Sequence, residues 1–146
     1  MRTTVTVLLL CGLMRVGSAQ QRQVIHTTNE VAGLPFSSAV RVGNLLFLSG
    51  QIGIVPATRQ LADTGIAGQT RQIFENIKSV LAASGGSLTQ LVKCTVFLAD
   101  IRDYAAMNAV YATYFPVDPP ARSTVAGSGL AFGARVEIEC IATVSP

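Results

Sequence analysis

The chain of 146 residues is poor in the residue types that carry most metal and nucleophilic chemistry. It has no tryptophan, one histidine (His26) and three cysteines (Cys11, Cys94 and Cys140). Without any CxxC or HxxxH spacing, neither a metal site nor histidine-based catalysis is expected. Cys94 and Cys140 lie in apolar segments, and we interpret them as buried thiols that pack as small hydrophobic side chains, in preference to a disulfide.

Charged residues are also scarce, at 13% of the chain, and the formal net charge is +3. Two basic residues, Arg2 and Arg15, lie in the first 19 positions. Without them nine basic residues face eight acidic ones, so the net charge of the remainder is +1. No cluster of Lys or Arg remains to neutralise phosphates, so nucleic acid is not an expected partner.

Residues 1–19 predict a secretory signal peptide. Arg2 precedes an apolar run from Val5 to Met14, and Gly17-Ser18-Ala19 supplies small residues for cleavage before Gln20. The run is shorter than the ~20 apolar residues that cross a bilayer, so no membrane association is expected after cleavage. A periplasmic or secreted protein is the first interpretation. A start at Met14 would give a cytoplasmic protein, and the acid-free basic stretch is also typical of a mitochondrial leader.

The rest of the chain, residues 20–146, predicts a single α+β domain. Residues 37–53 are typical of two strands around a Gly43-Asn44 turn. A helix over 66–84, a strand over 91–100, a second helix capped by Asp100 or Asp103, an extended segment over 121–127 and a last strand over 135–144 follow. This order predicts a mixed sheet with both helices packed on one face.

Finer assignments come from the periodicity of apolar residues. The continuous run Leu45–Leu48 predicts a strand covered on both faces. The sheet face opposite the helices is expected to be apolar in places, and hence buried by self-association. In the 91–100 strand, alternation assigns Val92 to the same face as Cys94, Val96 and Leu98. Phe74 is expected at the margin of the apolar stripe of the first helix. Gly50 and Gly53 mark a loop or bulge where the backbone can approach a ligand or neighbour.

The C-terminal segment contains three isolated charges of interest. Glu137 and Glu139 alternate with core residues of the last strand, so they lie on one face about 7 Å apart. They are either part of a solvated strand face, or one of them lines a cleft and handles a proton. Arg122 follows Pro119-Pro120 and is either a surface or ion-paired residue or a clamp for a small carboxylate.

Seven segments occur in the order and close to the spacing typical of the RidA (YjgF-type) family. They are PFSSAV, LFLSGQIG, QTRQIFENIKSVL, VKCTVFLAD, NAVYATYF, PARSTV and VEIECIA. The chain therefore resembles that family from about Ile25 to Val144. The resemblance implies a chorismate-mutase-like fold, a homotrimer with ligand clefts between subunits, and cofactor-independent deamination of 2-imino acids, a form of metabolite damage control.

The resemblance also implies roles for particular residues. Arg122 matches the arginine that pairs with the substrate carboxylate, and Glu137, rather than Glu139, matches the glutamate associated with the attacking water. The remaining positions assigned to substrate binding are Phe36, Ser49, Gly50, Asn108, Ser123 and Thr124. Thr124 stands where some members carry cysteine and is expected to contribute its backbone.

Two residues differ from the family pattern. Phe36 stands where many members have tyrosine, and Leu34 where they usually have glycine. The expected function is hydrolysis of reactive enamine and imine intermediates, like that of a 2-iminobutanoate/2-iminopropanoate deaminase, to 2-oxo acids and ammonia. The alternative is a non-enzymatic trimer that binds small carboxylates in the same clefts. Ribonuclease activity is disfavoured by the single histidine and the near-neutral charge.

Overall fold

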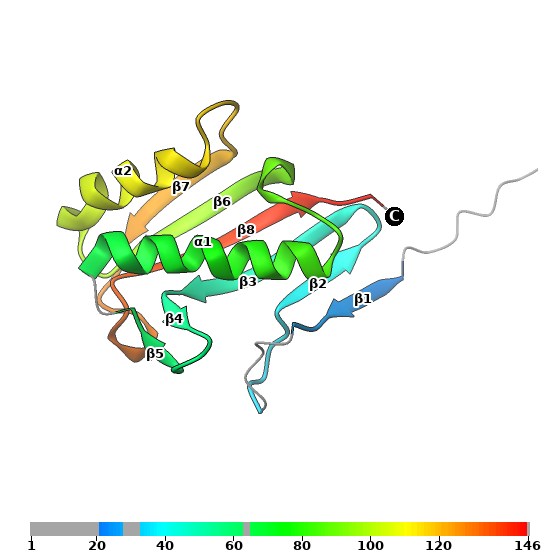
Figure 1. Cartoon of the computed structure of the whole chain (residues 1–146), viewed down its shortest axis with the longest axis horizontal. Coiled ribbons are helices and arrows are strands. Elements are labelled where there is room, and N and C mark those ends of the chain that lie inside the picture. Colours follow the sequence, from blue (N-terminus) through cyan, green and yellow to red (C-terminus); the bar gives the residue numbers. More distant parts are fainter. Residues whose placement is uncertain (1–20, 28–32, 63–64, 146) are drawn as a thin grey trace, which may run out of the picture.

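The computed structural model describes residues 21–27, 33–62 and 65–145. A six-stranded sheet is covered on one face by two helices, α1 (Gly65–Ala83) and α2 (Tyr104–Tyr114), as Figure 1 shows. Along the sheet the order is β1-β2-β3-β8-β6-β7, and only β6 and β7 run parallel among neighbouring strands of this sheet. The predicted α+β class, with a mixed sheet and both helices on one face, is confirmed. The strands are β1 (Arg22–Ile25), β2 (Ala39–Val42), β3 (Leu45–Ile52), β6 (Leu91–Leu98), β7 (Ala121–Ala126) and β8 (Val136–Thr143).

Smaller elements connect these strands and helices. β4 (Ile54–Val55) and β5 (Gln60–Leu61) form a separate two-stranded hairpin below α1 in Figure 1. Short 3-10 turns cover Leu88–Gln90, Ile101–Asp103 and Ala131–Gly133. Asp100 caps the second of these turns by accepting a hydrogen bond from the Arg102 backbone N–H at 2.9 Å. The Asp103 carboxylate instead pairs with Arg135.

The predicted hairpin turn at Gly43-Asn44 is confirmed. Ala39 pairs with Leu48 and Val42 with Leu45, and Gly43 has a φ of 61°, in the left-handed region that glycine adopts without strain. Further along β3 the register against β8 shifts between Leu48 and Gln51, which places a bulge at Gly50. This bulge reorients the end of β3 next to β8.

The core lies between the sheet and the helices and corrects two assignments. Phe74, expected at the margin of the α1 stripe, is fully buried against the α2 aromatics. Val92 does not share a face with Cys94, because the β6–β8 register shifts between Leu91 and Lys93. Leu91 therefore points into the core, and Val92 is 48% exposed.

The opposite face of the sheet is apolar in places and is not covered by any described part of the chain. Leu45 and Phe47, expected to be covered, are exposed together with Val125 of β7. β3 thus alternates between buried and exposed side chains within one copy. Exposed apolar side chains gathered on one sheet face are typical of an interface, so burial against another molecule is expected.

Cys94 and Cys140 form a disulfide bond, so their assignment as free thiols was wrong. They face each other directly across β6 and β8, with their Cα atoms 4.1 Å apart. Opposed positions of an antiparallel pair bring Cβ atoms within reach of a disulfide, a proximity that spacing in the sequence does not reveal. The bond lies under the helices, because both residues are buried.

The predicted leader, residues 1–19, and hence the boundary of the predicted domain at Gln20, lie outside the described residues. Within the described ranges, no helix has the length and apolar character needed to cross a bilayer.

Candidate active site

Arg122 lies on β7 beneath α2, where three side chains hold its guanidinium group. Its Nη2 donates to Asn108 Oδ1 at 2.7 Å and to the Tyr104 hydroxyl at 3.2 Å. The guanidinium carbon lies 4.4 Å from the centre of the Tyr111 ring, in cation–π geometry. No carboxylate of the described residues pairs with it. An oriented, half-buried arginine without an acidic partner is suited to bind an anion.

Two hydroxyl groups near Arg122 have no hydrogen-bond partner within the described chain. Tyr111 is buried and its hydroxyl is unpaired, as is the buried hydroxyl of Thr124 on β7. Burial raises the pKa of Tyr111 to about 12, and the charge of Arg122 opposes that shift. The phenol therefore stays neutral at ordinary pH and keeps its ring beneath the cation. The Thr124 hydroxyl is enclosed, so we expect Thr124 to contribute its backbone, on the edge strand β7, and not its side chain.

Glu137 lies on β8 directly beside the β3 bulge. A Cβ atom placed on Gly50 would lie 2.0 Å from Glu137 Oε1 and 2.9 Å from its carboxyl carbon. The carboxylate thus occupies the space that a side chain at Gly50 would need. Burial, followed by the negative charge of Glu139, raises the pKa of Glu137 above its usual value. A carboxyl group with a raised pKa is better matched to proton transfer near neutral pH.

We expect Gly50→Ala to displace the Glu137 carboxylate and to lower activity at least tenfold, because the alanine methyl group would overlap Oε1. Steady-state kinetics and a crystal structure of the variant would measure the two effects. Gly127→Ala is a matched control, since a Cβ there meets no atom within 4 Å. An active Gly50→Ala variant with Glu137 in place would contradict the expectation.

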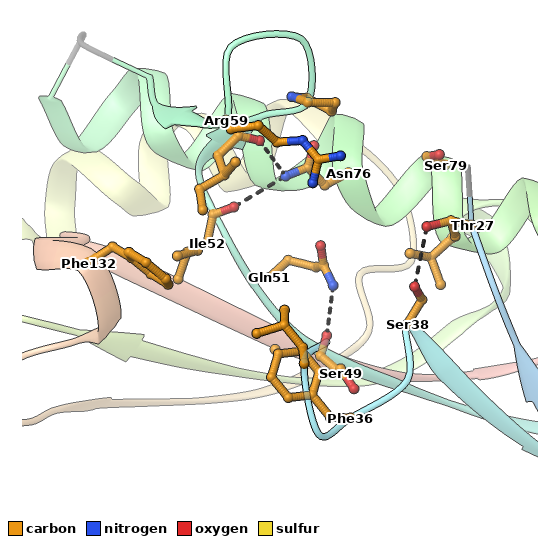
Figure 2. Close-up of a pocket in the computed structure, with 15 residues that line it drawn as sticks. Thr27, Phe36, Ser38, Ser49, Gln51, Ile52, Arg59, Asn76, Ser79 and Phe132 are labelled. Atoms are coloured by element: carbon orange, nitrogen blue, oxygen red, sulfur yellow. Dashed lines mark hydrogen bonds between the residues drawn. The ribbon is translucent and has the colours of Figure 1, made fainter. Parts of the chain in front are cut away.

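Phe36, Ser49 and Gly50 line a pocket of about 180 Å³ between β3, α1 and the β4–β5 hairpin (Figure 2). Phe36 is 57% exposed at its mouth. The Ser49 hydroxyl donates to the Ser37 carbonyl at 2.6 Å, which holds the segment that carries Phe36. Ser49 therefore supports the pocket wall and retains its oxygen as an acceptor.

The predicted residues form two groups on opposite faces of the sheet. Arg122 is in register with the core residue Cys94, so it shares the helix face with its partners on α2. Glu137 is in register with Phe97, between two core residues of β6, so it lies on the other face. Ser123 also lies away from the helices, where its hydroxyl binds Lys93 Nζ at 2.7 Å. A single chain does not bring Arg122 and Glu137 around one small ligand.

Sequence reasoning missed the residues that support these groups. Tyr111 packs in the core and Tyr104 is 42% exposed, and both also contact the Arg122 guanidinium. Their α2 spacing of seven residues, close to two helical turns with Asn108 between them, was the available indication. Arg59 and Phe132, which line the pocket, have no periodic pattern that would single them out.

The chain matches a family model described as Endoribonuclease L-PSP over residues 27–144. It is 40% identical over 126 residues to the mouse protein named 2-iminobutanoate/2-iminopropanoate deaminase, covering 86% of this chain and 93% of that one. It is 41% identical over 128 residues to Reactive Intermediate Deaminase A, chloroplastic, of Arabidopsis thaliana, covering 87% of this chain and 68% of that one.

Solved structures resemble this chain in fold and in sequence. RidA from the Antarctic bacterium Psychrobacter superimposes with a TM-score of 0.79 at 41% identity, over 84% of this chain and 99% of that one. The YjgF gene product of E. coli gives a TM-score of 0.77 at 36% identity, over 83% and 98% of the two chains. The fold is therefore the chorismate-mutase-like one expected from the sequence. With its family match, its relatives and its architecture in agreement, the chain belongs to the YjgF/RidA family.

Proposed function

We propose that this protein hydrolyses small 2-imino acids to 2-oxo acids and ammonia, in clefts between the subunits of a homotrimer. The observation that carries the proposal is the Arg122 guanidinium, which is oriented by Asn108 and Tyr111 and has no carboxylate partner in the described chain. Relatives named as deaminases of imino acids, at 40–42% identity, support the reaction class.

Assembly from several copies follows from the separation of the two charged groups. Arg122 and Glu137 occupy opposite faces of the sheet, so one ligand can contact both only if they come from different subunits. The exposed apolar face around Phe47 and the edge strand β7 supply the surfaces for such contacts. A closed ring of identical copies would bury both surfaces.

Arg122 would bind the carboxylate of the imino acid. Only Nη2 of its guanidinium makes hydrogen bonds within the described chain, and the bond to the Tyr104 hydroxyl, at 3.2 Å, is the longer of the two. If Nη2 exchanges that bond for a carboxylate oxygen, Nη1 and Nη2 together donate two parallel N–H···O bonds, which would fix the orientation of the substrate as well as its position. The Tyr111 hydroxyl, whose pKa is raised to about 12, stays neutral, and the Tyr111 ring keeps the guanidinium in place.

Glu137 would activate the water. As water attacks the iminium carbon, a C–O bond forms and Glu137 accepts the proton released by the water. The protonated Glu137 then returns this proton to the nitrogen of the carbinolamine. The C–N bond breaks and ammonia leaves. The ammonia takes up the hydroxyl proton as the C=O bond forms, so that ammonium and a 2-oxo acid are released. The iminium is already electrophilic, so positioning and proton transfer supply most of the catalysis.

Glu137→Gln is expected to lower kcat at least 100-fold in an assay that follows pyruvate formation from 2-aminoacrylate generated in situ, because the amide cannot accept the proton. Wild-type activity should decline with falling pH through the raised pKa of Glu137, at a higher pH than for an ordinary glutamate. Glu139→Gln, an exposed neighbour on the same strand, is the matched control and should retain nearly full activity at neutral pH.

Loss of stability cannot account for the expected inactivity of Glu137→Gln. A carboxyl group with a raised pKa in the folded state binds its proton more tightly there than in the unfolded chain. Its ionisation therefore disfavours folding as pH rises from the unfolded pKa through the folded pKa. The neutral glutamine avoids this cost, so the thermal midpoint of the variant should not fall. Equal kcat values for Glu137→Gln and wild type would contradict the role of Glu137.

A binding protein without catalysis is the alternative function, and Phe36 is the observation that favours it. Its exposed ring at the pocket mouth offers an apolar contact at the position where the resemblance to the family implies a tyrosine hydroxyl. In the same assay, binding of 2-oxo acids without faster pyruvate formation would identify this alternative. Restoring the hydroxyl by Phe36→Tyr would then show whether that group limits the rate.

The disulfide bears on the compartment. Stable disulfides persist in secreted and periplasmic proteins, whereas cytosolic thiols are kept reduced. The bond between Cys94 and Cys140 therefore favours export, in agreement with the signal peptide expected at residues 1–19, over a cytoplasmic start at Met14. Intact mass of the native protein would identify its N-terminus and its thiol content together.

A further inference from the structure

The pocket behind Phe36 has a composition suited to a particular class of ligand. Its walls include Phe36, Ile52 and Phe132, and Ser49 contributes an oxygen. Of the described residues that line it, Arg59 alone carries a charge. In Figure 2, Arg59 lies at the side of the pocket nearest α1, across from Phe36, with the amide of Gln51 between them. An apolar pocket with one cation at its rim favours a small organic anion.

Backbone strain is concentrated at the same place. Arg59 has a φ of 60° and Phe132 a φ of 58°, in the left-handed region that L-residues rarely adopt. The other described non-glycine residue in this region is Asp118, which does not line the pocket. Glycine at position 59 would complete the β4–β5 turn with less strain. The presence of arginine there points to a use for its side chain.

Within the described residues, no side-chain hydrogen bond ties the Arg59 guanidinium to the rest of the fold. The backbone N–H of Arg59 donates to the Val55 carbonyl at 2.9 Å, which closes the turn. No described carboxylate forms an ion pair with its guanidinium, whereas Arg102 pairs with Asp100 and Arg135 with Asp103. A charged group placed beside an apolar pocket without a partner remains available to a ligand.

We propose that Arg59 binds the side-chain carboxylate of the substrate, so that the preferred substrates are acidic 2-imino acids, the imines of four- or five-carbon dicarboxylates. This inference rests on the proposed function. Glu137 lies against Gly50 on the sheet face away from the helices, and Gly50 also lines the pocket beside α1. On its β2 side, β3 has no described pairing beyond Ser49. A substrate whose imine carbon lies near Glu137 can therefore extend its side chain around the edge of β3 at Gly50 toward Arg59. Its own 2-carboxylate would be bound by Arg122 of a neighbouring subunit.

The test compares imines of glutamate and alanine, generated in situ by amino-acid oxidases, in wild type, Arg59→Gly and Arg59→Lys. Arg59→Gly should lower kcat/KM for the glutamate-derived imine about tenfold or more, with little change for the alanine-derived imine, because one charged hydrogen-bonding partner is lost. Arg59→Lys should have an intermediate effect, since lysine keeps the positive charge but cannot form two parallel hydrogen bonds with a carboxylate. Asp118→Gly replaces a residue with a similar φ outside the pocket and is the matched control. It should leave kcat/KM unchanged for both the glutamate-derived and the alanine-derived imine.

A binding measurement separates this inference from the proposed function. Isothermal titration with 2-oxoglutarate should give a Kd about tenfold higher for Arg59→Gly than for wild type, while 2-oxobutanoate binds both equally. If wild type hydrolyses no imine but binds 2-oxoglutarate in this Arg59-dependent way, deamination fails and the anion site stands. The inference would be overturned if Arg59→Gly left two quantities unchanged. They are the ratio of kcat/KM for the glutamate-derived imine to kcat/KM for the alanine-derived imine, and the Kd for 2-oxoglutarate. So would a wild-type preference for the phenylalanine-derived imine over the glutamate-derived one.

Discussion

Replacing Arg122 with alanine is expected to lower kcat/KM for imine hydrolysis by about 100-fold or more, because the substrate carboxylate loses its paired donors inside a cleft. The same variant should bind 2-oxobutanoate too weakly for titration. Arg122→Lys keeps the positive charge but cannot form two parallel hydrogen bonds, so it should recover only part of the activity. Rates with 2-aminoacrylate and calorimetric Kd values measure both effects.

Controls for Arg122 must account for its contacts in the core. The guanidinium stacks on Tyr111 and binds Asn108, so its removal is expected to cost some stability as well as activity. The thermal midpoint of each variant therefore needs to be measured alongside the rates. Arg102→Ala removes another arginine near α2 whose side chain is exposed and pairs only with Asp100 in the described chain. Full activity of a folded Arg122→Ala protein would refute the assigned role.

Loss of the disulfide is expected to lower the free energy of unfolding by about 3–4 kcal/mol. The bond joins positions 46 residues apart, and a covalent link over a loop of that length restricts the unfolded chain by about this amount. Cys94→Ala/Cys140→Ala should therefore unfold at a markedly lower urea concentration than the oxidised wild type. Equilibrium urea titrations followed by circular dichroism measure the difference.

Reductant supplies the control for this prediction. It should lower the urea midpoint of the wild-type protein toward that of Cys94→Ala/Cys140→Ala and leave the double variant unchanged. Because both cysteines are buried, the samples must reach equilibrium through unfolding before they are compared. Identical midpoints for wild type with and without reductant would contradict a stabilising disulfide.

The elements of the fold could be predicted from local pattern because each reflects a short-range property of the chain. Alternation along residues 136–143 assigned Glu137 and Glu139 to one face and Ile138 to the core, as the burial pattern of β8 confirms. Gly43 lies in the expected hairpin turn, and Gly85 follows the end of α1, which was expected at residue 84 and lies at Ala83; both glycines have positive φ. The assignment failed at Val92, where a one-residue bulge in the pairing with β8 breaks the alternation.

The candidate site could be predicted only as a set of residues, by resemblance to a family. Local sequence pattern does not indicate which strands far apart in the chain become neighbours, so the pairing of Cys94 with Cys140 and the pocket between Phe36, Arg59 and Phe132 were not foreseen. These contacts join segments far apart in the chain. Their geometry depends on the packing of the sheet and not on any periodicity.

The sequence by itself determined the alternation of buried and exposed positions, the turns at glycine, the family, and the presence of Arg122 and Glu137 at the family positions. Tertiary structure alone decided that these two charges lie on opposite faces of one sheet, that two cysteines meet across adjacent strands, and that a strained arginine borders the pocket beside Gly50. The physical reason is that side-chain direction follows from each strand's local geometry, whereas proximity follows from strand order and register, which are set by the packing of the whole domain.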